Sequence, residues 1–250
     1  MEVYESGRFG VTSKDDERSS PLTLADLAAN RVIIEGLSRL SPQLPVLSEE
    51  CREVPYAERS RWERFWLVDP LDGTKEFLKR SDEFTVNIAL VEGRSPVFGV
   101  VFAPARSLLY YGLRGRGAFR VSGAGRPEPI RTAPYEPGGP IRIVASRSHR
   151  SAGLDAFLQR LGDVRALSIG SSLKFCLVAE GSAHLYPRLG PTMEWDTAAA
   201  QAVVEAAGGL VTDLARRPLA CNKPNLLNPS FMASGVPSPP WWDHVETKPE

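Results

Sequence analysis

The chain has 250 residues, of which 42% are hydrophobic and 24% charged, close to the averages of globular domains. This composition argues against a disordered or fibrous protein, and the length is enough to bury one large core or two smaller ones. Lysine plus arginine and aspartate plus glutamate number 30 each, so no net charge attracts the chain to nucleic acid or to an anionic membrane. Nucleic acid is therefore not expected as a partner, although balanced charge leaves room for a local basic patch.

The cysteines and the N-terminus indicate a reducing compartment. The three cysteines form no CxxC pair, so neither a disulfide scaffold nor a zinc knuckle is predicted. The first residues lack the basic and apolar regions of a signal peptide, and no apolar stretch approaches the length of a membrane span. The expected location is the cytoplasm, either free or peripherally bound at the inner face of the inner membrane.

The first half of the sequence predicts a helix followed by a sheet. Apolar residues at helical spacing indicate a helix over about residues 24–40, capped by Thr23 or Ser20. Residues 51–64 are polar and typical of a loop. Strands separated by linkers that suit an antiparallel meander are expected at 65–68, where Asp69-Pro70 stops the pairing, and at 84–91, 96–103 and 108–111.

A different pattern follows residues 126–140, which hold five prolines and two glycines and mark a predicted domain boundary. Strands and helices then alternate, as in an α/β domain. We expect an α+β half over 1–138, an α/β half over 139–235 and a tail over 236–250 that resembles an appendage. The strands are expected at 141–145, 164–167, 184–186 and 210–212, and the helices at 154–161, 172–179 and 196–207.

The segment 66–74 carries the strongest chemical signal. An apolar strand delivers Asp69 to its end, and the turn at Asp72-Gly73 lets both carboxylates and the Leu71 carbonyl point at one locus. Hard divalent cations prefer such oxygen ligands. Thr74 is predicted to open a helix, and the N–H groups of Gly73 and Thr74 are candidates for holding a phosphate. The alternative is that Asp-Pro and Asp-Gly are simply turn residues.

Two further acidic segments accompany it. Glu49-Glu50 follows the apolar residues 45–47, and Asp196 precedes an alanine-rich helix. Taken alone, the glutamates fit a solvated loop and Asp196 fits a helix N-cap. Together with segment 66–74, the acidic groups suit two or three magnesium ions that activate water and stabilise a leaving phosphate.

At this point the sequence resembles the inositol monophosphatase superfamily of magnesium-dependent, lithium-sensitive phosphatases. Within it, the resemblance is strongest to the bacterial CysQ branch, the 3′(2′),5′-bisphosphate nucleotidases, and it covers about residues 1–232. It rests on LSEE at 47–50, WLVDPLDGTKEF at 66–77, FTVNIAL at 84–90, SRSH at 146–149, SIGSSLKFCLVAEG at 168–181, LYPR at 185–188 and WDTAA at 195–199.

The resemblance implies a layered α-β-α-β-α sugar-phosphatase fold with the active site between its halves. It implies that Asp26 and Thr74 orient and deprotonate the attacking water. Read from the sequence alone, Asp26 fits an exposed carboxylate near a helix N-terminus, Lys174 a surface lysine and His149 a capping or surface histidine. The implied magnesium ligands are Glu49, Asp69, Leu71 through its carbonyl, Asp72 and Asp196. The implied substrate contacts are Glu49, Leu71, Asp72, Gly73, Thr74, Ser146, His149, Ser171, Lys174 and Asp196, with Arg188 as a further phosphate candidate.

The implied activity is removal of the 3′-phosphate of adenosine 3′,5′-bisphosphate, giving AMP and phosphate, a clearing step in sulfate assimilation. An inositol monophosphatase or fructose-1,6-bisphosphatase with the same chemistry is the nearest alternative, and a metal- or nucleotide-binding regulator is the non-enzymatic one. Lithium is the expected inhibitor, and a homodimer is an open expectation. Two features depart from the family. Its members usually begin with a long helix, of which residues 1–6 correspond to the last turn, and the tail after Ser234 is not a family feature.

Overall fold

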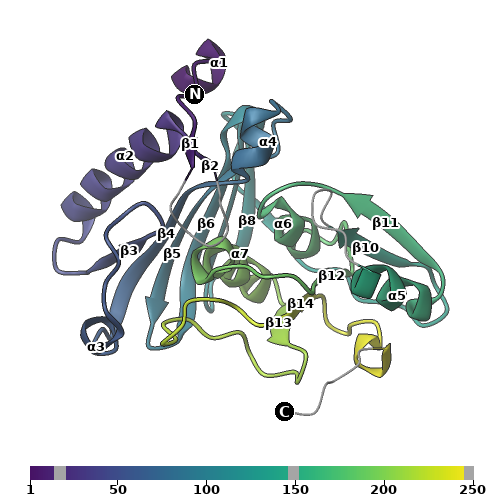
Figure 1. Cartoon of the computed structure of the whole chain (residues 1–250). Helices are drawn as coiled ribbons and strands as arrows, with labels where there is room; N and C mark the ends of the chain where they lie inside the picture. Colours follow the sequence, from purple (N-terminus) through teal and green to yellow (C-terminus); the bar gives the residue numbers. More distant parts are fainter. Residues whose placement is uncertain (14–20, 146–151, 245–250) are drawn as a thin grey trace.

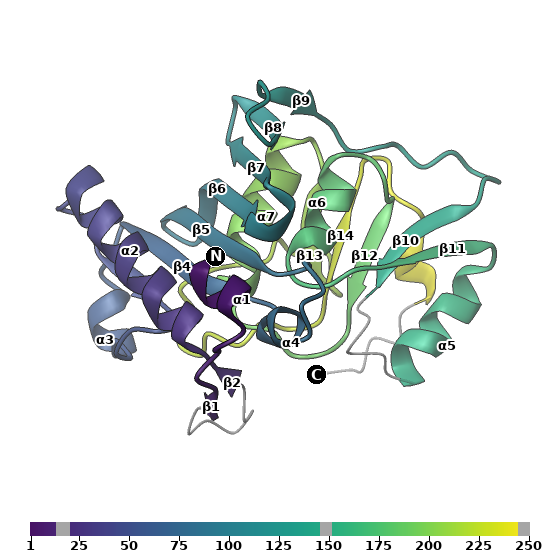
Figure 2. The same ribbon diagram turned by 90° about the horizontal axis from the view of Figure 1, so that it is seen from above.

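In the computed structural model, which describes residues 1–13, 21–145 and 152–244, helices and sheets alternate in layers. Seen from above, helix α2 (Leu24–Leu40) is followed by a seven-stranded sheet and then by α6 (Leu173–Ala179) and α7 (Glu194–Ala206) (Figure 2). A five-stranded sheet and helix α5 (Ala152–Leu161) complete the stack. The predicted α-β-α-β-α arrangement is confirmed.

The seven-stranded sheet is largely the predicted meander (Figure 1). Each strand from β4 onward pairs antiparallel with the next along the chain, while the first strand pairs parallel with β4. Strand β9 lies inside the proline-rich stretch 126–140 and extends the edge of this sheet. The strands, in spatial order, are β3 (Val46–Ser48), β4 (Arg64–Asp72), β5 (Thr85–Glu92), β6 (Ser95–Ala103), β7 (Leu108–Leu113), β8 (Gly117–Ser122) and β9 (Glu128–Ile130).

The prediction that the strand stops at Asp69-Pro70 is wrong, because β4 continues to Asp72. Asp69 pairs with Asn87 and Asp72 with Thr85, so the register shifts between these two pairs. One extra residue on β4 makes this a bulge, where a proline without an N–H removes no ladder hydrogen bond. The bulge lets one strand present two aspartates close to each other.

The second sheet is mixed. Its first three strands are parallel, and the strand Phe231–Ser234 runs antiparallel to both of its neighbours. This agrees with the alternating pattern predicted for the second half of the sequence. The strands, in spatial order, are β11 (Val164–Ser168), β10 (Ile141–Ala145), β12 (Leu185–Arg188), β14 (Phe231–Ser234) and β13 (Leu210–Asp213).

The remaining elements are short. Residues 51–64, expected to be a loop, contain a helical turn whose Arg59 is buried by contacts with a distant segment. Thr23 caps α2, as predicted, in a capping box with Asp26. These elements are α1 (Glu2–Ser6), β1 (Thr12–Ser13), β2 (Pro21–Leu22), α3 (Tyr56–Arg59), α4 (Thr74–Leu78), and the 3₁₀ turns η1 (Pro104–Arg106) and η2 (Trp241–His244).

Helix α7 is buried between the two sheets and lies very close to the larger one. Its alanines at 198–200 are buried in the main hydrophobic core, which also takes side chains from both sheets and from α6. The sheet has glycines where it faces this helix. A Cβ on Gly99 would lie 2.0 Å from the Ala199 carbonyl oxygen, and a Cβ on Gly112 would lie 2.8 Å from the Val203 Cα. Small residues on both sides therefore set the spacing of the layers.

The C-terminal segment is part of the fold up to residue 244, so its prediction as an appendage is wrong. Trp241 is 3% exposed and packs with Phe157 of α5 and Ile143 of β10 in a second core. The Tyr135 N–H also donates to the Pro237 carbonyl. Burial of a large indole outweighs the loop-like composition of this segment. The predicted division at 138/139 stays a prediction.

We predict that Gly99→Ala lowers the free energy of unfolding by at least about 1–3 kcal/mol, because the added methyl group must push α7 away from the sheet. Gly36→Ala is the matched control. Gly36 lies within α2, and apart from its chain neighbours and the backbone of its own helix no described atom lies within 4 Å of the place where an added Cβ would stand. This change should therefore stabilise the protein by up to about 1 kcal/mol. Urea denaturation measures both, and an unchanged Gly99→Ala would contradict the close packing.

Candidate active site

Three carboxylates from separate parts of the chain converge. Oxygen atoms of Glu49, Asp69 and Asp196 all lie within 4.8 Å of one another. Glu49 directly follows β3, which pairs in parallel with β4, and its N–H donates to the Val68 carbonyl. This places it beside Asp69, while α7 brings Asp196 from the second half. The structure thus brings together three of the predicted metal ligands.

The electrostatics of this cluster suit a cation. Asp69 is 1% exposed, and burial together with the charges of Glu49, Asp72 and Asp196 raises the pKa of its carboxyl well above the usual 3.8. The Leu71 N–H, which donates to Asp69 at 3.0 Å, only partly offsets this. Carboxylates crowded in this way are the oxygen ligands of a hard divalent ion, so the residues fit magnesium.

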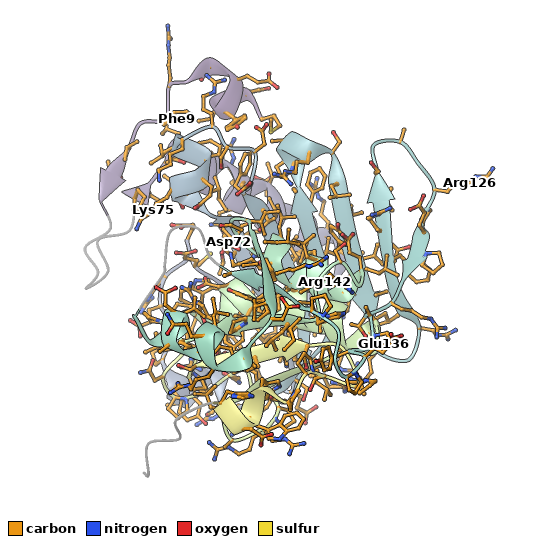
Figure 3. The ribbon with its side chains drawn as sticks, turned by 90° about the vertical axis from the view of Figure 1, so that its right-hand side faces the viewer. Phe9, Asp72, Lys75, Arg126, Glu136 and Arg142 are labelled. Carbon is orange, nitrogen blue, oxygen red and sulfur yellow. The ribbon has the colours of Figure 1, made fainter. Side chains whose placement is uncertain are left out.

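Asp72 lies next to the cluster and is held by side chains from both halves. The Ser172 hydroxyl lies 2.7 Å from its Oδ2 and 2.9 Å from the Asp196 carbonyl oxygen. Thr85 and Asn87 of β5 each donate to the same Oδ2 at 3.4 Å. In Figure 3, Asp72 lies where the bluish N-terminal ribbons meet the green C-terminal ones.

Asp196 is not the N-cap that its sequence position suggests when read alone. The helix begins two residues earlier, at Glu194, so Asp196 is the third helical residue and accepts a hydrogen bond from the Met193 N–H at 2.8 Å. This bond fixes Asp196 Oδ2 at the first turn of α7. The carboxylate is therefore oriented by its own helix before any ligand binds.

The predicted water-activating pair has separate partners in this structure. Thr74 begins α4 after Gly73, whose φ of 89° is the left-handed conformation that favours glycine, and its hydroxyl donates to the Leu71 carbonyl at 3.4 Å. Asp26 is 2% exposed, contrary to its reading as a surface carboxylate, and accepts from the Thr23 N–H at 2.8 Å and hydroxyl at 2.5 Å. Their pairing stays a prediction.

Lys174 is buried rather than on the surface, at 6% exposure. Its ammonium donates to the Ser171 carbonyl at 2.5 Å and lies 5.6 Å from the centre of the Tyr186 ring. Burial lowers the pKa of the Lys174 ammonium to about 8, although the nearby Asp72 carboxylate opposes this effect. A buried lysine bonded to a carbonyl retains the capacity to bind an anion.

Two polar atoms near Lys174 are buried without a hydrogen-bond partner in the described part of the chain, Ser171 Oγ and Arg188 Nε. Ser171 has a positive φ of 47°, which is unusual for a residue with a side chain. Arg188 also donates through Nη2 to the Pro191 carbonyl at 2.9 Å. The predicted contacts Ser146 and His149 lie outside the described residues.

Three residues that hold the site together were not expected from the sequence: Ser172, Thr85 and Asn87. The Asn87 side chain donates to the Ser172 hydroxyl at 2.9 Å and is 1% exposed. A signal existed for Asn87, because an amide inside an otherwise apolar strand must find a buried partner. Ser172 carried no such signal, since a serine before a helix reads as a cap.

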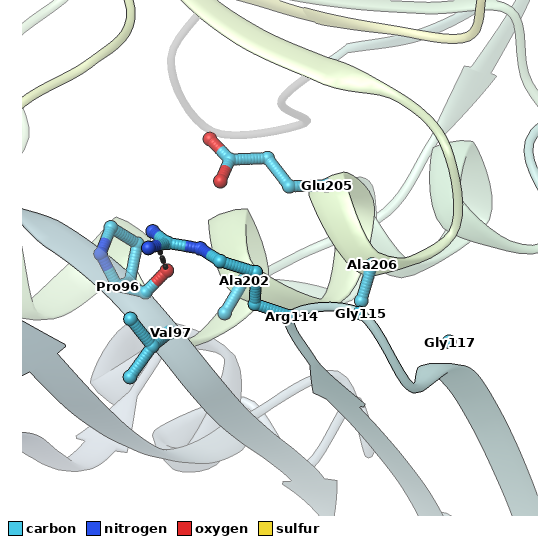
Figure 4. A pocket seen from close by; sticks show the side chains of 8 residues that line it. All are labelled: Pro96, Val97, Arg114, Gly115, Gly117, Ala202, Glu205 and Ala206. Atoms are coloured by element: carbon cyan, nitrogen blue, oxygen red, sulfur yellow. Dashed lines mark hydrogen bonds between the residues drawn. The ribbon is translucent and has the colours of Figure 1, made fainter.

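A hollow at the other end of α7 is separate from this site. Figure 4 shows Arg114, whose guanidinium donates to the Pro96 carbonyl, beside Glu205. Glu205 lies nine residues beyond Asp196, more than two helical turns away, and burial raises the pKa of its carboxyl. The carboxylate cluster is therefore the better candidate for catalysis.

Comparison with known proteins decides the family. The model of the inositol monophosphatase family matches residues 1–240. The chain belongs to this family. A 3′(2′),5′-bisphosphate nucleotidase CysQ of Escherichia coli K12 is 49% identical over 237 residues, covering 94% of this chain and 93% of the relative. The CysQ of Haemophilus influenzae is 36% identical, covering 96% and 89%.

Solved structures agree with this assignment. The crystal structure of CysQ from Bacteroides thetaiotaomicron, a bacterial member of the family, has a TM-score of 0.81 at 42% identity, covering 94% of this chain and 90% of its own. The SuhB protein of Bartonella henselae has a TM-score of 0.77 at 25% identity, covering 94% and 87%. The resemblance inferred from the sequence motifs is confirmed.

We predict that Asp69→Asn stabilises the metal-free protein at neutral pH. The folded-state pKa of Asp69 is raised above 3.8, so the folded state binds the proton more tightly than the unfolded chain does. Its stability therefore falls as pH rises from about 3.8 through the raised pKa, and stays lower above it. Asparagine cannot ionise, so the advantage of the variant should vanish towards pH 3.8.

Thermal denaturation in EDTA across this pH range measures the effect. Asp243→Asn, which removes an exposed carboxylate, serves as the control. Added magnesium should raise the melting temperature of the wild type more than that of Asp69→Asn. An Asp69→Asn protein that is less stable than the wild type in EDTA at pH 7 would contradict the repulsive cluster.

Proposed function

We propose that this chain is a magnesium-dependent 3′(2′),5′-bisphosphate nucleotidase, which removes the 3′-phosphate of adenosine 3′,5′-bisphosphate to give AMP and phosphate. The observation that carries the proposal is the convergence of Glu49, Asp69 and Asp196 beside a buried lysine, in a chain 49% identical to a CysQ nucleotidase. The reaction would clear this nucleotide during sulfate assimilation.

Two to three magnesium ions are the proposed cofactors, with lithium as an inhibitor. Bound at the carboxylate cluster, the magnesium ions would neutralise the phosphate and lower the pKa of the attacking water. The chain supplies ligand oxygen atoms from both halves. The Ser172 hydroxyl contacts Asp72 Oδ2 and the Asp196 carbonyl oxygen, and so holds these two proposed ligand residues at a fixed separation. The proposed ligands are Glu49, Asp69, the Leu71 carbonyl, Asp72 and Asp196.

Thr74 and Asp26 are the proposed residues for orienting and deprotonating water. Both lie in rigid surroundings, since Thr74 begins α4 and Asp26 sits in the capping box of α2. The N–H groups of Gly73 and Thr74 are the proposed donors to the phosphate that is cleaved. Positioning of this kind removes the entropy cost of bringing water, base and phosphate together.

The second phosphate and the base are assigned to the C-terminal half. Lys174 supplies the charge. Ser171 Oγ and Arg188 Nε are buried, have no hydrogen-bond partner among the described residues, and would be satisfied by a phosphate oxygen. Ser146 and His149, in the SRSH motif, are the further proposed contacts. The metal site grips only the phosphate being cleaved, so discrimination between substrates must come from these residues.

Location and assembly remain at the level of expectation. Within the described ranges, no helix is long and apolar enough to cross a bilayer. A cytoplasmic location and a homodimer stay predictions. Nothing in the described residues supports peripheral attachment to the inner membrane.

A turnover panel with magnesium tests the proposal. Adenosine 3′,5′-bisphosphate should be hydrolysed far faster than inositol 1-phosphate or fructose 1,6-bisphosphate. A preference for either sugar phosphate would instead favour the alternative activities of the family. Absence of turnover on all three, with magnesium and nucleotide still bound, would favour a regulator.

We further predict that Lys174→Ala lowers kcat/KM for adenosine 3′,5′-bisphosphate tens-fold or more, because a buried charge partner of the second phosphate is lost. Slow hydrolysis of a nucleoside 3′-monophosphate should barely change. In the wild type, KM for the bisphosphate should rise as pH passes about 8, where Lys174 loses its charge.

The exposed Lys79→Ala is the control and should leave both substrates unaffected. If Lys174→Ala slowed the two substrates equally, Lys174 would be serving the fold or the carboxylate cluster, and the assignment of specificity to it would be wrong.

A further inference from the structure

The first turn of α7 is bound by a buried ion pair to a loop at residues 222–228, which is distant in the sequence. Glu194, whose side chain is 0% exposed, accepts from the Lys223 ammonium at 2.7 Å. Its two oxygens also accept from the N–H groups of Asn222 at 2.6 Å and Lys223 at 2.9 Å. Glu194 is two residues from Asp196 in the same helical turn, so whatever holds Glu194 holds Asp196 as well.

The same loop also forms hydrogen bonds to this turn through Asn228, which is 5% exposed. Its amide donates to the Met193 carbonyl at 2.8 Å and to the Thr197 hydroxyl at 3.0 Å, and its oxygen accepts from the Lys223 ammonium at 3.1 Å. The turn that carries Asp196 is therefore bracketed on both sides.

Arg59 joins this assembly to the other half of the site. Its guanidinium is buried and donates to Asn222 Oδ1 at 2.9 Å and to the carbonyls of Lys223 and Pro224 at 2.7 Å each. The Asn222 amide donates back to the Arg59 carbonyl at 2.8 Å. Arg59 belongs to α3, in the segment that links Glu49 at the end of β3 to β4 with Asp69.

We infer that Arg59, acting with Glu194 and Lys223, is a positioning residue that sets the separation of Asp196 from Glu49 and Asp69. The inference rests on the proposed function of these carboxylates as magnesium ligands. Three crowded carboxylates repel one another, and Asp196 arrives on a different element from the other two. A guanidinium that spans two carbonyls and an amide in fixed fork geometry opposes this separation.

Charge and position predict opposite results when Arg59 is changed. Arg59 is a cation, so by charge alone its removal would strengthen the binding of another cation in the same region. Its role in position predicts weaker binding, because the carboxylates would spread apart. The direction of the change therefore distinguishes the two effects.

The experiment is calorimetric titration of the substrate-free protein with Mg²⁺, using Arg59→Gln, Arg59→Lys and Asn222→Gly. Arg59→Gln should bind Mg²⁺ about tenfold more weakly, the lower end of losses seen when outer-shell partners of metal ligands are changed. Arg59→Lys keeps the charge but replaces the planar, rigid fork of the guanidinium with a compact ammonium on a flexible stem, so it should also bind more weakly. At saturating Mg²⁺, the kcat of these variants should lie closer to the wild-type value than their Mg²⁺ affinity does.

Asn222→Gly is the mild variant. Asn222 has a φ of 55°, which glycine adopts without strain, and the change removes only the two side-chain bonds to Arg59. It should weaken Mg²⁺ binding several-fold, and it gives the result should Arg59→Gln not fold. Phe157→Leu, in the second core, is the control for lost stability and should leave Mg²⁺ affinity unchanged.

The outcomes separate the two levels of the proposal. If the wild type binds no Mg²⁺, the proposed metal site is wrong. If the wild type binds Mg²⁺ and Arg59→Gln and Asn222→Gly bind it equally well or more tightly, the positioning role of Arg59 is wrong. Weaker binding in Asn222→Gly and unchanged binding in Phe157→Leu would support it.

Discussion

The close packing of α7 against the larger sheet is the constraint on which the site depends. Gly99 and Gly112 leave room for the helix backbone, and the alanines of α7 leave room for the sheet. A helix held so near β6 and β7 brings its first turn close to the last part of β4, which contains Asp69. Without this approach, Asp196 of the second half would lie apart from Glu49 and Asp69 of the first.

Burying the carboxylates together has an electrostatic cost, since burial and then the neighbouring negative charges raise the pKa of Asp69. The fold opposes this repulsion with neutral and cationic groups placed around the cluster. The Ser172 hydroxyl contacts both Asp72 and the Asp196 carbonyl oxygen. Glu194, in the first turn of α7, binds Lys223, whose carbonyl accepts a hydrogen bond from Arg59. In the proposed function, the carboxylates that bind magnesium come from both halves, while the residues assigned to the second phosphate come from the C-terminal half alone.

Local signals were sufficient for much of this protein. The alternation of strands and helices, the capping of α2 by Thr23 and the meander after β4 all follow from spacing and turn chemistry, which act over a few residues. The candidate ligands were also visible, because an aspartate directly after a buried apolar strand has little structural reason to be there. The family motifs added the order in which these segments occur, and with it the layered fold.

Other features depended on contacts between residues far apart in the sequence. The bulge that extends β4 to Asp72, the helical turn at α3, the burial of Lys174 and the docking of Trp241 each contradict the local pattern. In every case a partner from another segment supplies the compensating contact: a shifted register with β5, the carbonyls near Lys223, the ring of Tyr186, and the side chains of α5. The sequence by itself determined most of the helices and strands and which residues carry charge. The tertiary structure decided which of those charges are buried and meet, because burial and Coulomb energy depend on spatial separation and not on distance along the chain.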